Sequence, residues 1–267
     1  GTIVAISSYA SYFWQPIMNL GNIFNNFINN IAYLERIFET MDEPVTVKDA
    51  KDAVEMPKIR GEVTFDHVNF SYDASKQILN DVSFTVKPGE SVALVGPTGA
   101  GKSTIVNLIS RFYNVNGGRV LIDGQDISQV TIHSLREQMG IMMQDSFIFS
   151  GDIEDNIRYG KLDATHEEIV KASRTVCADE FISKMPDRYQ TEVRERGSML
   201  SQGQKQLISF ARTLLSDPAI LILDEATSSI DVQTEKALQT GLNAMLKGRT
   251  SFIIAHRLST IRNASLI

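Results

Sequence analysis

An apolar run followed at once by a glycine-rich loop restricts the possible folds of this chain more than any other feature. Residues 91–95 have the composition of a short buried strand, and the loop after them fits the pattern Gly-x-x-x-x-Gly-Lys-Ser. Glycines let backbone N–H groups close around phosphate oxygens, and the start of the following helix adds positive potential. The expected nucleotide-phosphate site consists of Gly96, Pro97, Thr98, Gly99, Ala100, Gly101, Lys102, Ser103 and Thr104.

A second apolar strand is expected to place two carboxylates beside this loop. Residues 219–223 are apolar and end in Asp224 and Glu225, and ligands of open α/β sheets bind at the carboxyl ends of strands. Lys102 would neutralise the β- and γ-phosphates, while the Ser103 hydroxyl and Asp224 would bind Mg²⁺. Glu225 is expected to act as the general base toward the attacking water.

The elements expected along the chain alternate between strands and helices, which is typical of an α/β fold. Strands are predicted at 63–72, 78–86, 91–95, 119–122, 140–143, 219–223 and 250–255. Helices between them predict a mostly parallel sheet that is covered on both faces. The 267 residues suffice for one large α/β domain with an appendage.

The N-terminal part differs from the rest of the chain in charge. Residues 1–34 contain no Lys, Arg, Asp or Glu, and this run exceeds the roughly 20 residues that cross a bilayer. Pro16 and six asparagines interrupt it, and four of the asparagines fall on one helical face. We expect residues 1–41 to be the end of a transmembrane domain, with an amphipathic helix of a soluble bundle as the alternative.

Domain boundaries follow from the polar stretch after this region. Residues 42–58 contain Pro44 and Pro57 and are predicted to be a linker. Residues 59–267 are predicted to be a nucleotide-hydrolysing domain that is truncated at its C-terminus. The net charge of −6 argues against nucleic-acid binding, and a single cysteine, Cys177, excludes an intrachain disulfide.

Further motifs occur in the order and spacing of the ATP-binding cassette (ABC) family, which this chain resembles from residue 59 to residue 267. An aromatic that stacks on adenine, a Q-loop glutamine, the Leu-Ser-Gly-Gly-Gln signature, a D-loop and a switch histidine all have counterparts. These counterparts are, in the same order, Tyr72, Gln144, the group Ser201, Gln202, Gly203 and Gln204, then Asp231 and His256.

The resemblance implies a P-loop NTPase core, an antiparallel β subdomain, a helical subdomain that carries the signature, and an N-terminal membrane-derived helix. Residues 33–38, 122–127, 192–197 and 253–258 are most similar to multidrug exporters of the half-transporter type. The cofactors implied are ATP and Mg²⁺. By this resemblance Lys102, Gln144, Glu225 and His256 act in catalysis, while Ser103, Gln144 and Asp224 hold the metal.

The resemblance also implies two partners and a location. A second cassette would pair head to tail, so that the signature of one chain completes the ATP site of the other. The transmembrane domain of the same polypeptide would place the cassette on the cytoplasmic side of a cell membrane. ATP binding and hydrolysis would then drive efflux of lipophilic or drug-like substrates. Because Gln202 replaces the usual glycine of the signature and Arg194 another usual glycine, homodimer and heterodimer both remain open.

Two other members of the family are the alternatives. The first is a soluble ABC ATPase of DNA repair or translation, and repair-type members usually carry a long coiled coil between phosphate loop and signature. Only about 97 residues separate Ser103 from Leu200, which suffices for a helical subdomain alone. An importer cassette has no membrane helix, and residues 1–34 argue against that class.

Overall fold

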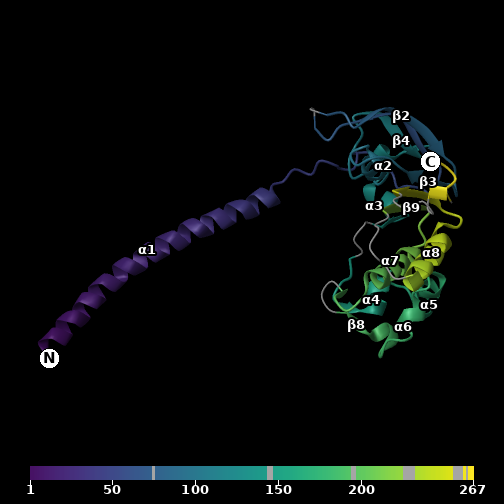
Figure 1. Cartoon of the computed structure of the whole chain (residues 1–267). Helices are drawn as coiled ribbons and strands as arrows, with labels where there is room; N and C mark the ends of the chain where they lie inside the picture. The colour runs from purple at the N-terminus through teal and green to yellow at the C-terminus, as the bar shows by residue number, and fades with distance from the viewer. Residues whose placement is uncertain (74–75, 143–146, 194–196, 225–231, 255–260, 263) are drawn as a thin grey trace. The chain divides into compact units, whose positions relative to one another are not determined.

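The computed structural model describes residues 1–73, 76–142, 147–193, 197–224, 232–254, 261–262 and 264–267 (Figure 1). The chain divides into two compact units, Gly1–Thr46 and Val47–Ile267.

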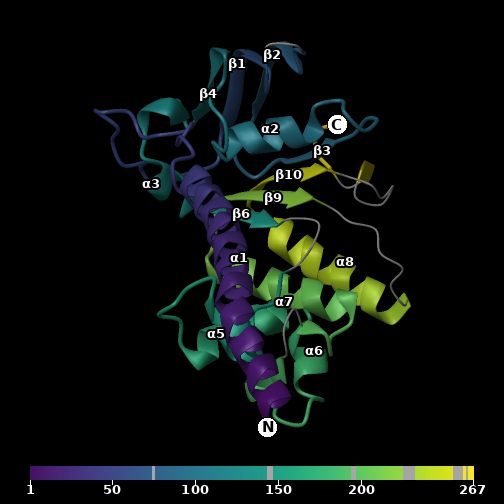
Figure 2. The same ribbon diagram turned by 90° about the vertical axis from the view of Figure 1, so that its left-hand side faces the viewer.

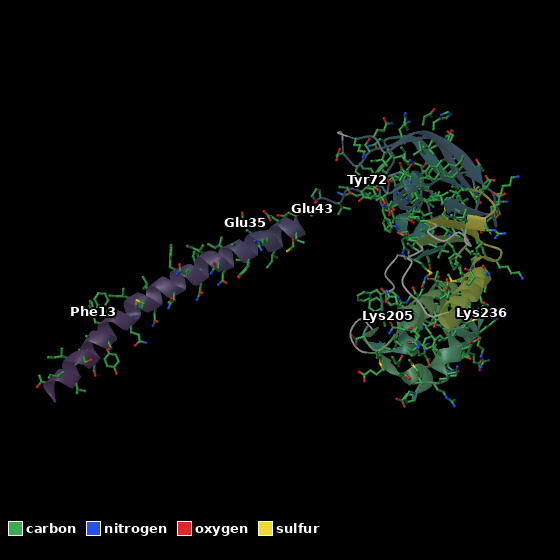
Figure 3. The ribbon with its side chains drawn as sticks, viewed as in Figure 1. Phe13, Glu35, Glu43, Tyr72, Lys205 and Lys236 are labelled. Carbon is green, nitrogen blue, oxygen red and sulfur yellow. The ribbon has the colours of Figure 1, made fainter. Side chains whose placement is uncertain are left out.

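The first unit consists mainly of one helix, α1, Thr2–Met41. Pro16 lies inside this helix, and none of its residues is buried. Its apolar part carries exposed aromatic side chains such as Phe13, whereas charged residues such as Glu35 lie nearer its C-terminal end (Figure 3). The long N-terminal helix predicted from the sequence is therefore confirmed. None of the described helices combines the length and the hydropathy that a membrane span requires.

The described residues of the second unit form two four-stranded sheets and a short two-stranded one. The antiparallel sheet has the order β2-β1-β4-β5, formed by β1 (Val63–Phe70), β2 (Leu79–Val86), β4 (Gly117–Ile122) and β5 (Gln125–Asp126). The parallel sheet has the order β3-β10-β9-β6, formed by β3 (Ser91–Leu94), β6 (Met139–Met142), β9 (Ile220–Asp224) and β10 (Thr250–Ile254). The short pair is β7 (Gly151–Asp152) with β8 (Glu192–Val193).

Helices lie between and below the two large sheets (Figure 2). Helix α2, Lys102–Ile109, lies between the antiparallel and the parallel sheet, and 3₁₀ helix η1 (Ile127–Gln129) and α3 (Ile132–Arg136) lead into β6. The helical part below the parallel sheet comprises α4 (Ile153–Arg158), α5 (His166–Thr175), α6 (Asp179–Ile182), η2 (Arg188–Gln190), α7 (Gln202–Leu215) and α8 (Val232–Leu246).

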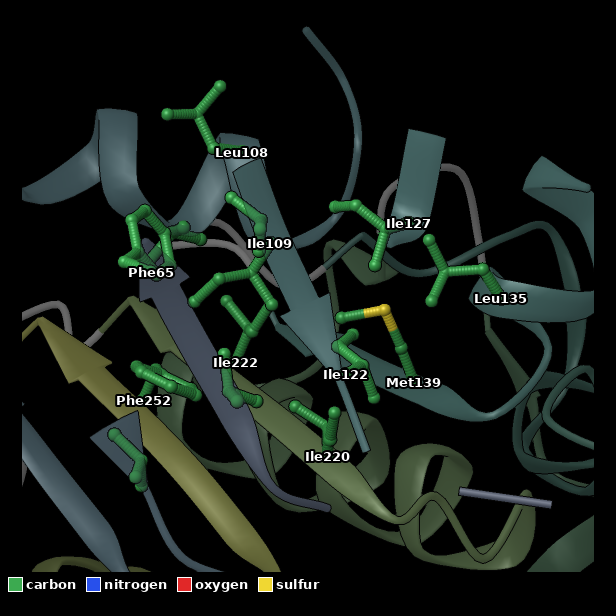
Figure 4. Close-up of a cluster of buried hydrophobic side chains, with 14 of the residues drawn as sticks. Phe65, Leu108, Ile109, Ile122, Ile127, Leu135, Met139, Ile220, Ile222 and Phe252 are labelled. Atoms are coloured by element: carbon green, nitrogen blue, oxygen red, sulfur yellow. The ribbon is translucent and has the colours of Figure 1, made fainter. Parts of the chain in front are cut away.

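The parallel sheet separates two hydrophobic cores. Successive side chains of a strand point to opposite faces, so Ile220 and Ile222 of β9 belong to the core beneath the antiparallel sheet (Figure 4). Leu221 and Leu223 of the same strand belong to the core of the helical part. Burial on both faces explains why β9 reads as an unbroken apolar run and not as an alternating one.

The predicted strands agree with the structure to within a few residues. The antiparallel subdomain, the parallel core sheet and the helical subdomain are all confirmed. Strand β1 ends at Phe70, two residues earlier than predicted, and β4 begins at Gly117, two residues earlier. Strands β7 and β8 were not predicted, because each has only two residues and so carries no periodicity.

Most of the region predicted to be a linker, 42–58, lies within the second unit. The boundary between the units falls after Thr46, so residues 47–59 form the first segment of the second unit. We call these residues the strap. Met56 and Ile59 are buried in the core beneath the antiparallel sheet, and Val54 forms a parallel bridge with Val130. Hydrogen bonds to residues far along the chain hold this segment in place.

Candidate functional site

The loop between β3 and α2 has the backbone that a phosphate-binding loop needs. Gly96, Gly99 and Gly101 have φ values of 149°, 84° and 91°, a region that favours glycine. Gly101 is the N-cap of α2, and no side chain among the described residues caps the helix. Its first N–H groups therefore have no side-chain acceptor, and the helix N-terminus is suited to bind an anion. A Cβ on Gly101 would lie 3.0 Å from Leu79 Cδ2, so the Leu79 side chain would have to shift slightly to admit another residue.

The lysine of the motif lies across this loop. Lys102 Nζ donates to the carbonyl oxygens of Gly96 at 2.8 Å and Pro97 at 3.0 Å. Two carbonyl oxygens of the loop thus hold the ammonium group. Residues 95–100 and Ser103 are exposed, so the loop surface is accessible to a ligand from solvent. The loop fits the di- or triphosphate of a nucleotide.

Tyr72 lies next to the same helix. Its hydroxyl forms a hydrogen bond with Thr104 Oγ1 at 3.2 Å and accepts one from Asn107 Nδ2 at 3.3 Å. The ring contacts Phe70 and Tyr113 edge to face, with both centroid distances at 4.9 Å, and Tyr72 remains 48% exposed. The structure thus places the aromatic candidate beside the phosphate loop, where its ring is open to a base.

The register of the parallel sheet places Asp224 on the same edge as the phosphate loop. Ile254 of β10 is paired with Leu94 on one side and with Asp224 on the other. Neighbouring strands are about 4.8 Å apart, so Leu94 and Asp224 are separated by about 10 Å, and the loop that starts after Leu94 lies near the carboxylate. This edge is where open α/β sheets bind ligands.

The residues around this edge fit a magnesium site of the kind that nucleotide enzymes use. Mg²⁺ is usually held by one or two carboxylates, water and substrate phosphates, and does not require a cage of protein ligands. Asp224 and the Ser103 hydroxyl can supply oxygen ligands for the metal on that edge. Within the described part of the chain, no group of three or more His, Cys, Asp or Glu side chains could hold a metal on its own.

Four of the predicted site residues, Gln144, Glu225, Asp231 and His256, lie outside the described residues. The strands that precede three of them in the sequence are neighbours in one sheet. Strand β6 ends two residues before Gln144, β9 ends directly before Glu225, and β10 ends two residues before His256. The roles of these four residues stay predictions.

The signature residues begin helix α7 and are organised differently from the phosphate loop. Ser201 is the N-cap, and its Oγ accepts from Gln204 N at 3.2 Å, while Ser201 N donates to Gln204 Oε1 at 2.9 Å. This reciprocal pair is a capping box. Ser201 and Gln202 are exposed, whereas Gly203 is buried. Lys205 of the same helix and Tyr72 lie on separate parts of the second unit (Figure 3).

An exposed aromatic cluster was missed in the sequence. Phe147, Phe149 and Tyr159 are 55%, 39% and 60% exposed, with ring centroids 4.9 Å apart for the first pair and 4.7 Å for the second. The Arg212 guanidinium lies 5.4 Å from the Phe149 ring and donates to Phe147 O at 3.0 Å. Burial lowers the pKa of Arg212. The available signal was two aromatics within five residues of Gln144, but sequence alone does not show that they are exposed.

Comparison with known proteins decides the family. The family described as ABC transporter matches residues 79–228, which include the phosphate loop, the signature and Asp224. The chain belongs to the ABC transporter family. An uncharacterized ABC transporter ATP-binding protein of Bacillus subtilis is 54% identical over all 267 residues, which correspond to 44% of that protein. A fatty acid ABC transporter ATP-binding/permease protein of Mycobacterium tuberculosis is 45% identical over the whole chain and 42% of its own length.

A solved structure of similar fold agrees with this assignment. The structure of a bacterial Atm1-family ABC exporter with ATP bound superposes with a TM-score of 0.80 at 41% sequence identity. It covers 100% of this chain, including α1, and 47% of the exporter chain. The chain thus spans less than half the length of the ABC transporter proteins that it matches, and it includes their ATP-binding cassette.

Proposed function

We propose that this cassette binds and hydrolyses ATP with Mg²⁺ and thereby drives export across a cell membrane. The observation that carries the proposal is the shared sheet edge, on which the phosphate loop and Asp224 lie two strands apart. Phosphoryl transfer depends on positioning and charge neutralisation more than on covalent chemistry, and both are available there.

Each residue then has a defined task. The glycine loop and Lys102 hold the phosphates, and Tyr72 stacks on the base. Ser103 and Asp224, together with Gln144, hold Mg²⁺, which supplies neutralisation of the phosphate oxygens. Glu225 accepts a proton from the attacking water, and His256 orients the γ-phosphate.

A second cassette completes the site. Two chains pair head to tail, so that Ser201 and Gly203 of one face the nucleotide bound by Lys102 of the other, with Asp231 at the interface. Two observations favour sharing between chains. The signature and Tyr72 lie on separate parts of one unit (Figure 3), and the capped start of α7 is exposed at Ser201. The partner is a second copy of this cassette or a related one.

The N-terminal unit connects the cassette to the membrane. Residues 1–41 are proposed to be the end of a transmembrane domain and residues 59–267 the ATPase domain. Residues 42–58 are proposed to connect them, and from residue 47 onward this connection belongs to the second unit as the strap. The aromatic cluster of Phe147, Phe149 and Tyr159 follows Gln144, and strand β8 precedes Arg194 directly. Together these segments are proposed to contact the membrane domain and transmit its movement.

The transported class is proposed to be lipophilic or drug-like. A putative multidrug export protein of Bacillus subtilis is 48% identical over the whole chain, and a β-(1→2)glucan export protein of Rhodopseudomonas palustris is 43% identical. Cassettes of such similar sequence serve proteins with very different named cargoes. Cargo choice is therefore assigned to the membrane domain. Similarity to exporters over α1 as well as the cassette favours an exporter over an importer or a soluble ATPase.

The decisive experiment removes the proposed base. Glu225→Gln keeps the size of the side chain but cannot accept the proton, so ATP turnover should fall at least about 100-fold while ATP affinity is retained. Hydrolysis is measured by phosphate release, and binding by a fluorescent ATP analogue. Glu167→Gln, an exposed carboxylate on α5, serves as the control and should behave as the wild type. Full turnover by Glu225→Gln would remove this residue from the role of base.

A further inference from the structure

The strap is anchored along one side of the cassette by directional hydrogen bonds. Val54 N donates to Gln129 O at 3.1 Å, and Val54 O accepts from Thr131 N at 2.9 Å. Met56 N donates to Ser134 Oγ at 2.7 Å. These contacts attach the strap to the segment of η1 and α3, which leads into β6. The strap therefore has a defined position and does not act as a loose tether.

A second set of contacts secures its C-terminal end. Ile59 N donates to Gln138 Oε1 at 2.8 Å, and Gln138 Nε2 donates back to Pro57 O at 3.1 Å and Met56 O at 3.3 Å. Gln138 stands directly before β6, the strand that ends two residues before Gln144.

Arg111 joins the strap to the end of the phosphate-loop helix. It follows the C-cap of α2, and its side chain is 2% exposed. The guanidinium donates to the carbonyl oxygens of Val130, of Ser128 at 3.3 Å and of Lys48 at 3.1 Å. Asp49 Oδ1 lies 3.7 Å from Arg111 Nη1. A single side chain thus connects α2, the strap and the segment around η1.

The end of α2 is also held from the other side. Arg136 Nε donates to Ser110 O at 3.0 Å, and Arg136 Nη2 donates to Arg111 O at 2.9 Å. Helix α2 has eight residues and is about 12 Å long, with Lys102 in its first turn and Arg111 just past its last. A helix of this length moves as one body, so a displacement at Arg111 also changes the position of Lys102.

A buried guanidinium is an expensive way to fill this space. Burial lowers the pKa of Arg111, while the Asp49 carboxylate opposes that shift. Arg111 Nε is buried and has no hydrogen-bond partner among the described residues. Apolar residues of similar volume often stabilise a fold as well as a buried ion pair does. The contacts of Arg111 are therefore better explained by the geometry they impose than by stability.

We propose that Arg111 is a positioning residue for ATP binding, which fixes the phosphate-loop helix relative to the strap and thereby couples the strap to the nucleotide site. The proposal rests on the proposed function, because it requires that the loop binds ATP. The strap continues directly into the first unit, so this coupling supplies a route to the nucleotide that bypasses the Gln144 region. Coupling between two sites is reciprocal, so ATP must in turn change the stability of the strap.

Hydrogen exchange of the strap amides tests this reciprocity. The full-length protein in lipid nanodiscs is compared with and without a non-hydrolysable ATP analogue and Mg²⁺. In the wild type we expect the nucleotide to change exchange of the Val54, Met56 and Ile59 amides by about threefold or more. Arg111→Lys keeps the positive charge but loses the planar guanidinium with its several N–H donors. In this variant the nucleotide-dependent change in exchange should disappear, and ATP affinity should fall about 3- to 10-fold.

Two further variants separate coupling from structural damage. Arg119→Lys is the matched control, because Arg119 is exposed and pairs with Asp66 at 2.8 Å on the surface of the antiparallel sheet; it should respond as the wild type does. Asp49→Asn can still accept from Ile132 N, which Asp49 does at 2.8 Å, but loses the charge beside Arg111. It should weaken the nucleotide-dependent change and leave the basal exchange of the strap close to that of the wild type.

Three results would overturn the proposal. The first is a wild type that binds the analogue without any change in strap exchange. The second is a strap response that persists unaltered in both Arg111→Lys and Arg111→Met; the latter variant fills the space if the lysine variant does not fold. The third is a wild type that binds no nucleotide, which would overturn the proposed function together with this inference.

Discussion

The phosphate loop and the signature both place polar groups at the start of a helix, yet the two helix starts are built in opposite ways. At α2 the N-cap is Gly101, and within the described part of the chain no side chain caps the first N–H groups. At α7 the N-cap is Ser201, and a capping box with Gln204 satisfies two donors, the N–H groups of Ser201 and Gln204. The first start is open to an external anion, whereas the second is already closed by its own side chains.

This difference corresponds to different tasks in the shared site. An open helix start can bind phosphates by itself. A capped start is already ordered before a ligand binds. Because Ser201 Oγ accepts from Gln204 N, its hydroxyl can offer a partner's nucleotide little more than the donation of its proton. We therefore expect the phosphate loop to set ATP affinity within a chain, and the signature to act only when a second cassette presents its nucleotide.

The largest effect is expected from the phosphate loop itself. Lys102→Ala removes the cation that lies over the loop, and turnover should fall about 100- to 1,000-fold, with ATP binding strongly reduced. The measurements are phosphate release and titration with a fluorescent ATP analogue. Lys205→Ala removes a lysine near the start of α7 and is the control. Equal losses in the two variants would contradict the division of tasks between the helix starts.

Mixing two inactive chains tests whether the signature serves the partner. A Lys102→Ala chain and a Ser201→Arg chain each form homodimers with two damaged sites, whereas the mixed dimer has one doubly damaged site and one intact site. ATPase activity should reappear, at roughly a quarter of the wild-type level for random pairing in a symmetric dimer. Mixed dimers are quantified by two different affinity tags.

One result of the mixing experiment would contradict the shared site. A mixed dimer that forms with ATP, yet is no more active than either homodimer, would refute sharing of the site between chains. If the transporter is a heterodimer, its natural partner chain takes the place of the second copy.

A smaller effect is expected from the contact with the nucleotide base, which we assign to Tyr72 beside the phosphate loop. Stacking of an aromatic ring on a base is worth about 1–3 kcal/mol, so Tyr72→Ala should weaken ATP binding about 5- to 150-fold. Tyr72→Phe keeps the ring and loses only the hydroxyl contacts with Thr104 and Asn107. It should change affinity less than about threefold. Unchanged affinity in Tyr72→Ala would assign this ring to packing alone.

The smallest effect is expected on stability at the capped start. Ser201→Ala removes the N-cap of α7 and should cost about 1 kcal/mol, measured as a fall in Tm of about 2–4 °C. Ser201→Asp preserves the cap but places a negative charge toward the partner's phosphates. It should keep the Tm of the wild type and still lose most ATPase activity. An active Ser201→Asp variant would show that Ser201 does not approach a nucleotide.

Much of the fold could be predicted because its strongest signals are local. Strands β3, β9 and β10 are buried on both faces, and such strands leave continuous apolar runs in the sequence. The phosphate loop was predictable for the same reason, since its glycines, Lys102 and Ser103 are adjacent in the chain. Two-residue strands such as β7 are too short to show a hydrophobic periodicity. The exposure of Phe147 depends on how other parts of the chain pack around it, which the sequence does not show.

By itself the sequence determined the phosphate loop, the strands that flank it and the family to which the motifs belong. The tertiary structure alone decided which strands are neighbours, and therefore that Asp224 lies two strands from the loop. It also decided that the strap is attached and that Arg111 ties it to α2. The physical reason is that motif and periodicity depend on neighbouring residues, whereas strand order and buried hydrogen bonds join residues such as Lys48 and Arg111 that are far apart in the chain.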